Sequence, residues 1–109
     1  MAHDEDVANR VREALADERD VREVRMFGGL AFMVRGKMAA TANAGGRLMV
    51  RCDPDRADEL LERPGASWPE MRGKRMAKGW IVVDAAVDDD FGLWMREALA
   101  YNRRTTGGG

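Results

Sequence analysis

Cysteine and histidine are almost missing from this sequence of 109 residues, which has one of each, Cys52 and His3. A single thiol excludes an internal disulfide bond and a metal site built from several thiolates. His3 stands near the N-terminus without a second ligand. Cys52 has no histidine to act as its base, and the carboxylate of Asp53 beside it disfavours a thiolate, so we expect a structural cysteine in the core. We therefore expect no metal and no cofactor, and no catalytic set indicates an enzyme.

Long apolar runs are also absent. The longest, Leu30–Val34, has five residues, whereas a helix needs about 20 to cross a membrane. No charged and then apolar leader begins the chain, so we expect a cytoplasmic protein with no secretory signal and no membrane partner. Hydrophobic residues make up 45% and charged residues 34%, as in ordinary globular domains. We expect one domain over residues 1–104 and a disordered tail over residues 105–109.

An excess of charge of one sign is missing as well, because 18 basic and 19 acidic side chains leave a net charge of −1. Averaged over the molecule, this balance argues against an anionic partner such as nucleic acid. The charges are nevertheless unevenly distributed: segments expected to be helical total −9 and segments expected to be extended total +8. This pattern predicts an acidic helix layer on a basic sheet layer, a polarity that also allows two molecules to attract each other head to tail.

Three segments have the pattern of amphipathic helices. Residues 4–17 repeat apolar side chains at helical spacing. Asp53 and Pro54 are a favourable N-cap and first position for a second helix, which we expect to end at Pro64. A third helix is expected to follow the acidic residues 88–90 and to end near residue 104. We interpret those carboxylates as a helix start rather than a cation site, because the helix dipole favours acids there.

The remaining segments alternate in polarity or run apolar, with glycine-containing turns between them. We interpret residues 21–34 as one strand, bulged at a glycine pair, followed by strands over residues 38–42 and 47–52. A hairpin is expected from residues 69–72 and 75–83. Connections this short favour antiparallel pairing. The prediction is an α+β two-layer sandwich of order α-β(3)-α-β(2)-α, with all helices on one face of an antiparallel sheet. The other face would be exposed or covered by a second subunit.

Met26, Phe27, Gly28 and Gly29 form the densest local motif. Glycine permits a positive φ or the close approach of another backbone. A phosphate-binding loop is the alternative, but no Gly-Lys-Ser/Thr follows and no helix is expected to start there. We therefore interpret the motif as structural.

A series of short blocks extends this motif along the chain: Arg25–Met33, Gly36-Lys37-Met38, Leu48–Arg51, Asp53-Pro54, Arg63-Pro64, Met71-Arg72-Gly73, Met76, Lys78-Gly79-Trp80 and Trp94–Tyr101. Together they resemble the N-terminal domain of the TfoX/Sxy family of bacterial competence regulators. The resemblance implies the fold α-β(3)-α-β(2)-α and a regulatory role. One departure is Arg75, where members often have proline. Another is that the full regulators add a C-terminal domain and this chain ends after the third expected helix, so the resemblance implies a free-standing domain rather than the competence role.

A candidate interaction surface combines two groups of residues. Regular alternation turns Arg47, Met49 and Arg51 away from the helices, onto the open sheet face, where a methionine among arginines suits a partner. The expected second hairpin adds a basic cluster: Arg72, Lys74, Arg75 and Lys78. Four cations at a hairpin could bind phosphates, but they are also a common way to protect a sheet edge.

Three functions remain open at this point. The first is a non-enzymatic regulatory or protein-interaction module that forms a homodimer through the open sheet face or an edge strand. The second is a nucleic-acid or anionic-ligand binder that uses the basic strands and hairpin. The third is a small-molecule protein with a pocket between the last helix and the sheet, near Trp80, Trp94 and Tyr101.

Overall fold

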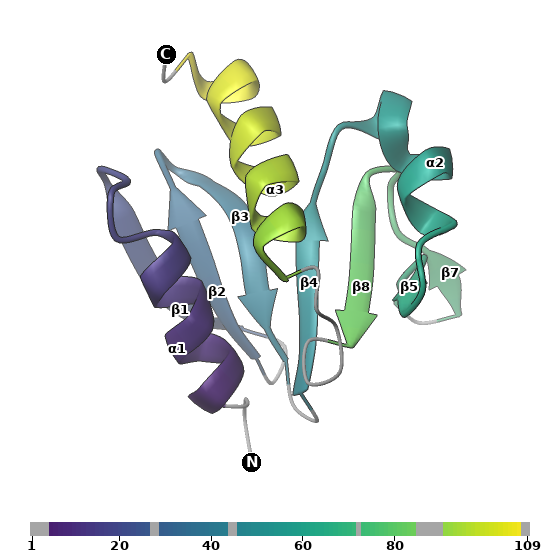
Figure 1. The fold of residues 1–109 in the computed structure, drawn as a ribbon, viewed down its shortest axis with the longest axis horizontal. Coiled ribbons are helices and arrows are strands. Elements are labelled where there is room, and N and C mark those ends of the chain that lie inside the picture. The colour runs from purple at the N-terminus through teal and green to yellow at the C-terminus, as the bar shows by residue number, and fades with distance from the viewer. Residues whose placement is uncertain (1–4, 27–28, 44–45, 72, 85–90, 108–109) are drawn as a thin grey trace.

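The computed structural model describes residues 5–26, 29–43, 46–71, 73–84 and 91–107. The helices are α1 (Glu5–Ala14), α2 (Ala57–Leu61) and α3 (Phe91–Thr106). α1 and α3 lie across one face of the sheet, and α2 lies beside its far strands (Figure 1). The described part of the chain is therefore an α+β fold with an antiparallel sheet, as predicted.

In the described residues, the main sheet has six strands in the spatial order β1-β2-β3-β4-β8-β5, and every neighbouring pair is antiparallel. Their bounds are β1 (Val21–Met26), β2 (Gly29–Val34), β3 (Lys37–Ala42), β4 (Arg47–Arg51), β5 (Ala66–Ser67) and β8 (Trp80–Asp84). A small second sheet pairs β6 (Glu70–Met71) with β7 (Lys74–Arg75). The strands thus outnumber the five expected from the sequence.

The prediction of one bulged strand over residues 21–34 is wrong. The chain reverses between Met26 and Gly29, which face each other, and β1 runs back along β2 until Val21 faces Val34. Residues 21–26 and residues 29–34 each have the polarity pattern of an extended strand. That pattern alone does not distinguish one strand with a bulge from two strands joined by a tight hairpin. The one register shift in this part of the sheet falls between Phe32 and Met33, where β2 pairs with β3.

The hairpin predicted from residues 69–72 and 75–83 is also different in the structure. Residues 75–83 are not one strand, because β7 and β8 belong to different sheets. Gly79 lies between them, with a φ of +108°, and its carbonyl accepts a hydrogen bond of 2.7 Å from Cys52 N at the end of β4. This bond fixes the start of β8 against β4. The short strand β5, in a segment expected to be loop, pairs with the same β8.

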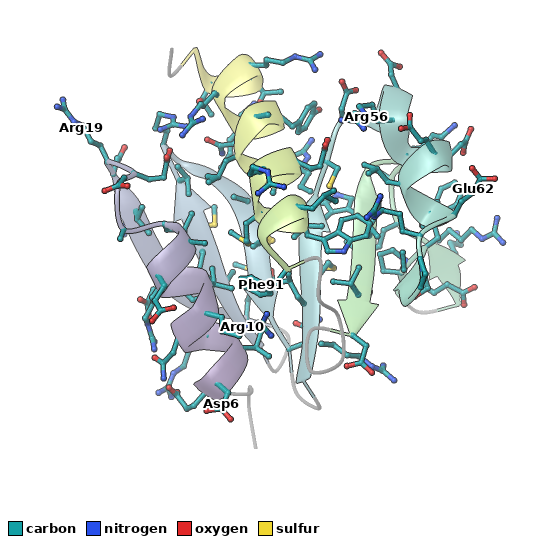
Figure 2. The ribbon with its side chains drawn as sticks, viewed as in Figure 1. Asp6, Arg10, Arg19, Arg56, Glu62 and Phe91 are labelled. Carbon is teal, nitrogen blue, oxygen red and sulfur yellow. The ribbon has the colours of Figure 1, made fainter. Side chains whose placement is uncertain are left out.

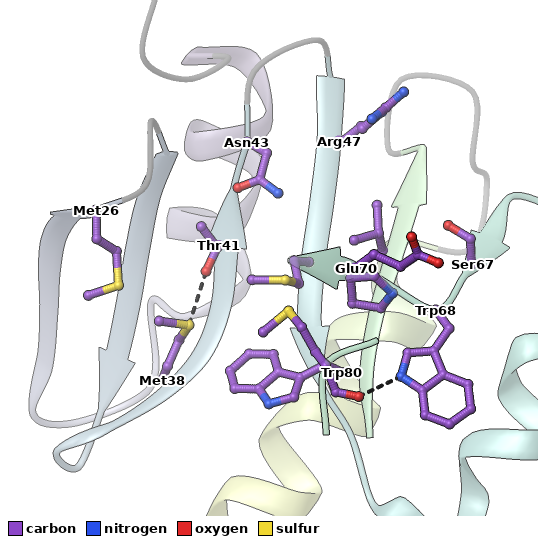
Figure 3. Close-up of a pocket in the computed structure, with 13 residues that line it drawn as sticks. Met26, Met38, Thr41, Asn43, Arg47, Ser67, Trp68, Glu70 and Trp80 are labelled. Carbon is purple, nitrogen blue, oxygen red and sulfur yellow. Dashed lines mark hydrogen bonds between the residues drawn. The ribbon is translucent and has the colours of Figure 1, made fainter. Parts of the chain in front are cut away.

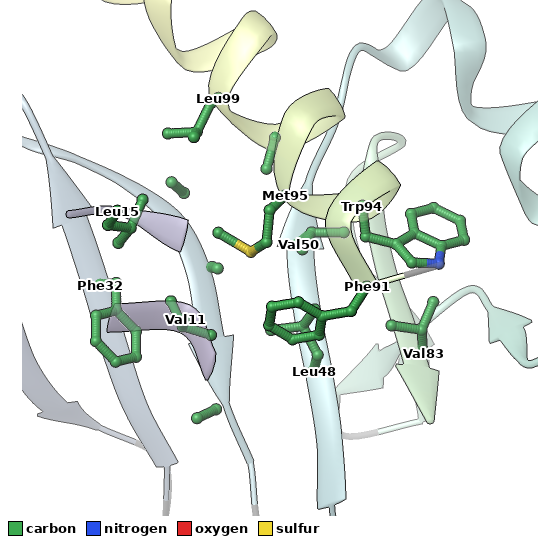
Figure 4. Packing of buried hydrophobic residues seen from close by; sticks show 14 of the residues in the cluster. Val11, Leu15, Phe32, Leu48, Val50, Val83, Phe91, Trp94, Met95 and Leu99 are labelled. Carbon is green, nitrogen blue, oxygen red and sulfur yellow. The ribbon is translucent and has the colours of Figure 1, made fainter. Parts of the chain in front are cut away.

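The core lies between the helices and the sheet (Figure 4). α3 contributes Trp94 and Met95, and the strands contribute Phe32, Leu48 and Val50, all 2% exposed or less. This tight packing follows from the alternation of the strands, which sends every second side chain to the helix face. Cys52 belongs to the same core, and burial raises the pKa of its thiol to about 12, which agrees with the predicted structural role.

The start of the second helical segment matches its prediction. The carboxylate of Asp53 accepts a hydrogen bond of 2.9 Å from Asp55 N, and Pro54 follows the cap. A 3₁₀ turn over Pro54–Arg56 precedes α2. At the other end of the chain, α3 continues through Thr105 and Thr106, which the sequence assigned to a tail.

Polar contacts tie the ends of the helices together. Asn102 is buried on α3, donates to the carbonyl of Val34 at 3.0 Å and accepts from Arg35 at 2.8 Å. Arg35 also pairs with Glu18, which Arg103 of α3 contacts as well. On α1, the guanidinium of Arg10 lies 4.2 Å from the centre of the Phe91 ring of α3, and Figure 2 shows this pair. The sequence assigned acidic side chains to the helix layer and basic ones to the sheet layer. Some of these side chains, such as Glu18 and Arg35, therefore form ion pairs with each other.

Candidate functional site

A pocket of about 630 Å³ lies on the sheet face opposite the helices (Figure 3). Its floor consists of side chains that alternate with the core residues of β4 and β8, such as Met49 and Val82, which face each other across the two strands. The segment from Ser67 to Glu70, together with Met76, forms the opposite wall. The face that the sequence left open is therefore partly covered by the chain's own β6–β7 hairpin.

Methionine dominates the apolar lining. The four methionines come from separate parts of the chain, namely β1, β3, β4 and the segment after β7: Met26, Met38, Met49 and Met76. Thr41 fixes one of them, because its hydroxyl donates to the sulfur of Met38 at 3.2 Å. Methionine is unbranched and polarizable, so such a lining adapts to apolar groups of different shape.

Two tryptophans stand at the same end of the pocket. Trp80 belongs to β8, and Trp68 precedes the small hairpin. The indole N–H of Trp68 donates to the carbonyl of Met76 at 2.8 Å, and Met76 N donates to the carbonyl of Pro69 at 2.9 Å. The guanidinium of Arg75 lies 5.0 Å from the centre of the Trp68 ring. These contacts close the hairpin on itself and hold the wall in place.

Polar groups gather at the other end. They are Asn43, Arg47, Ser67 and Glu70. Arg47 is exposed, and its guanidinium has no ion pair among the residues that the structure describes. The side chain of Glu70 likewise has no ion pair within that part of the chain. Within the described residues, the pocket therefore offers an apolar interior, with the guanidinium of Arg47 and the carboxylate of Glu70 outside any ion pair at its rim.

Comparison with known families decides the identity of the fold. The model of the TfoX N-terminal domain matches residues 13–101. The chain belongs to the TfoX N-terminal domain family. No curated protein and no solved structure matches it. Within the described residues, no helix is long and apolar enough to span a membrane.

The motif that carried the resemblance to this TfoX family lies at the pocket's margin. Met26 lines the pocket, and Gly29 faces it across the β1–β2 pairing. A Cβ on Gly29 would stand 2.7 Å from Asn43 Oδ1 and 3.0 Å from the carbonyl of Ala42. Glycine is therefore required here for close packing, which agrees with the structural interpretation. Phe27 and Gly28 lie outside the described residues.

The residues of the predicted interaction surface are distributed over several places. Arg47 and Met49 line the pocket. Arg51 lies instead at the end of β4, 5.4 Å from the Trp80 ring and 5.7 Å from the Tyr101 ring.

The residues of the predicted basic cluster that the structure describes have different neighbours. Lys74 and Arg75 are exposed on β7, and Arg75 covers Trp68. Lys78 pairs with Asp58 of α2 at 3.1 Å. Arg72 lies outside the part of the chain that the structure describes. Whether these residues bind a partner stays a prediction.

The pocket predicted between the last helix and the sheet is wrong in its location. Trp94 is fully buried there and fills the space against the strands. Trp80 does line a pocket, but on the opposite face. Sequence reasoning missed Trp68 and Met76 as its wall, because their position depends on how the hairpin folds over the sheet. The signal available was their position on either side of the turn in the hairpin expected from residues 69–72 and 75–83, whose packing over the sheet was not predicted.

Metal ligands do not cluster in the described residues, where no group of three or more histidine, cysteine or acidic side chains could hold an ion. His3 and Asp88-Asp89-Asp90 lie outside those residues. The TfoX domain thus has one candidate site in its described part, the methionine- and tryptophan-lined pocket.

Proposed function

We propose that this TfoX N-terminal domain is a non-enzymatic regulatory module that holds an apolar side chain of a partner protein in its methionine- and tryptophan-lined pocket. The pocket itself carries the proposal. Its volume of about 630 Å³ falls within the range of about 300–1,000 Å³ typical of sites that hold drug-sized groups. Methionine-rich linings are typical of proteins that bind partners of varied sequence.

The rim specifies the partner further. The free guanidinium of Arg47 suits a carboxylate, with which arginine forms charge-assisted and often bidentate hydrogen bonds. Asn43 beside it adds an amide that can donate or accept. A large apolar residue next to an acidic residue or a C-terminal carboxylate is therefore the preferred ligand chemistry.

The test is a titration of the full chain followed by NMR of ¹³C-labelled methionine methyl groups and tryptophan indole N–H groups. The probes are N-acetyl-phenylalanine and its neutral amide. We expect shifts at Met38, Met49 and Met76 and at Trp68 and Trp80, with tighter binding of the carboxylate.

Arg47→Gln should remove the preference for the carboxylate and leave binding of the amide unchanged. Arg96→Gln, at an exposed position of α3, is the matched control and should bind as the unaltered protein does. Shifts at the core residue Met95 without shifts at the pocket, or no shifts at millimolar probe, would overturn the proposal.

Nucleic-acid binding is less well supported by the geometry. Lys78 and Arg75 are engaged by Asp58 and Trp68, and a non-specific nucleic-acid surface needs several free cations that contact phosphates together. Titration with duplex and single-stranded DNA at low salt distinguishes the two functions. We expect no binding that weakens steeply with added salt.

A further inference from the structure

The first strand forms one edge of the sheet over its whole length. β1 pairs with β2 through all six of its residues, and its other side faces no strand of the described chain (Figure 1). The opposite edge, β5, has only two residues. β1 contains neither proline nor glycine, and β1 carries no bulge in its pairing with β2. A long regular edge of this kind is a template for another strand.

The backbone groups that β1 leaves unpaired can be assigned. Asp20, just before β1, accepts a hydrogen bond of 3.0 Å from Arg35 N, and these two residues continue the register in which Val21 faces Val34. Residues of an antiparallel strand alternate between pointing their backbone groups toward the partner and away from it. The N–H and C=O groups of Glu23 and Arg25 therefore point outward from the sheet.

The exposed side chains of β1 are complementary to a second copy of themselves. Val24 is, among the described residues, the one large hydrophobic side chain that is exposed, at 36%. Glu23 and Arg25 lie on either side of it and project to the helix face, where Arg12 of α1 holds Glu23 through two hydrogen bonds of 2.8 and 2.9 Å. A carboxylate has acceptor sites for more than one guanidinium, so Glu23 can accept from a further arginine.

We propose that two copies of this chain pair through β1, antiparallel and with Val24 opposite Val24. In this register Glu23 of each copy faces Arg25 of the other, and the outward backbone groups of both residues form about four hydrogen bonds, two for each facing pair. A two-fold axis perpendicular to the sheet keeps the helices of both copies on one side. A shift of two residues in either direction would also keep the helices of both copies on one side of the sheet. Those registers place Glu23 opposite Glu23 or Arg25 opposite Arg25, so repulsion between like charges favours the register centred on Val24.

The pairing makes one continuous sheet from the two six-stranded sheets and places both pockets on the same side. It does not depend on what the pockets bind. If they do hold partner side chains, the dimer would engage two at once and gain avidity.

Sedimentation equilibrium of the full chain at increasing concentration tests the pairing. We expect a monomer–dimer equilibrium in the unaltered protein. Glu23→Arg and Arg25→Glu each place like charges in both facing pairs, and each should weaken the dimer by about ten-fold or more. Arg96→Glu, a charge reversal at an exposed position of α3, is the control and should dimerise as before.

The two charge variants also test the register. Mixing them restores opposite charges in both facing pairs, so native mass spectrometry should show the heterodimer and little of either homodimer. Because Glu23→Arg also removes the partner of Arg12, its fold is checked by its unfolding curve, and amide exchange of the unaltered protein supplies a second measurement. Exchange at Glu23 and Arg25 N–H should slow with concentration, whereas exchange at Val24, bonded to β2, should not change.

A protein that stays monomeric at millimolar concentration overturns the proposal. So does a dimer that neither charge variant weakens, which would lie elsewhere. A mixture that forms no heterodimer rules out the Val24-centred register.

Discussion

Strand β4 shows how differently the two faces of the sheet are packed. Leu48 and Val50 point toward the helices and are fully buried. Arg47 and Met49 lie next to them along the same strand and line the pocket on the other face, where Met49 is partly buried and Arg47 is exposed. The helix face is filled by large rigid groups such as Trp94, whereas the pocket face is lined by flexible thioethers and closed by a short hairpin.

The difference has a physical reason. Interiors packed to the density of organic crystals lose dispersion contacts and leave a void when one side chain shrinks. A partly open face has no such void, because solvent or a ligand occupies the space. Stability is therefore expected to depend on the helix face and binding on the pocket face. Four predictions test this comparison, from the largest expected effect to the smallest.

Trp94→Ala should cost the most. It removes a fully buried indole from the core, and such changes cost about 3–5 kcal/mol. Met49→Ala on the opposite face should cost about 1 kcal/mol or less, since its side chain is only partly buried. Urea unfolding followed by circular dichroism measures both free energies. Equal losses for the two variants would contradict the division between the faces.

Gly79→Ala tests the junction that holds the hairpin and β8 to β4. Its φ of +108° disfavours any side chain, and a Cβ would meet the Cys52 carbonyl at 2.6 Å. We expect a loss of about 2 kcal/mol or more, because backbone strain adds to the clash. Gly73→Ala is the matched control: its φ is +79° but nothing lies within 4 Å of the added Cβ, so it should lose only about 1 kcal/mol. The same urea experiment measures the unfolding free energies of both variants. The difference between their losses gives the cost of the clash with the Cys52 carbonyl apart from the cost of the positive φ.

Cys52 gives the helix face a pH dependence. Burial is the main reason that its pKa rises to about 12, above the ordinary value of about 8.5 for a thiol. The folded protein keeps the thiol proton where the unfolded chain loses it. The free energy of unfolding should therefore fall as pH rises from about 8.5 toward 12, by at most about 1.4 kcal/mol per pH unit from this group.

Cys52→Ala should lower the stability at pH 7 but remove this part of the slope. Lysine and tyrosine titrate in the same range, so the difference between the two proteins is the quantity to measure. A thiol that reacts with a disulfide reagent at pH 8 as fast as free cysteine would show that Cys52 is not buried as described.

Trp68→Phe should cost less stability than Trp94→Ala or Gly79→Ala. It keeps an aromatic ring beside Arg75 but removes the indole N–H that bonds the Met76 carbonyl. One such hydrogen bond contributes about 0.5–1.5 kcal/mol. We expect little change in the unfolding curve and a clear change in the methyl shift of Met76. A loss as large as that of Trp94→Ala would mean that the pocket wall belongs to the core.

Much of the architecture could be predicted from local patterns. The cap at Asp53, the course of α3 from residue 91, the alternation of β4 and the buried state of Cys52 all follow from neighbouring residues, and the structure agrees with them. The hairpin between β1 and β2 was missed because a glycine pair between two alternating segments fits a bulge as well as a reversal. The separation of β7 from β8 was missed because it depends on a bond between Gly79 and Cys52, which are far apart in sequence.

The candidate site divides in the same way. Alternation along β4 was enough to turn Arg47 and Met49 away from the helices. No local pattern showed that Trp68 and Met76 would face them across a pocket, or that Lys78 would pair with Asp58. Those placements depend on how the β6–β7 hairpin is laid over the sheet, since each contact joins segments that sequence spacing does not relate.

The sequence by itself determined the family, the α+β class and which side chains of each strand share a face, because periodicity and capping act over a few residues. Only the tertiary structure decided that β1 ends the sheet as a long unpaired edge and that the face opposite the helices holds a pocket. Both depend on long-range strand order and on where a hairpin packs, which are set by the total burial and hydrogen bonding of the folded chain rather than by any one segment.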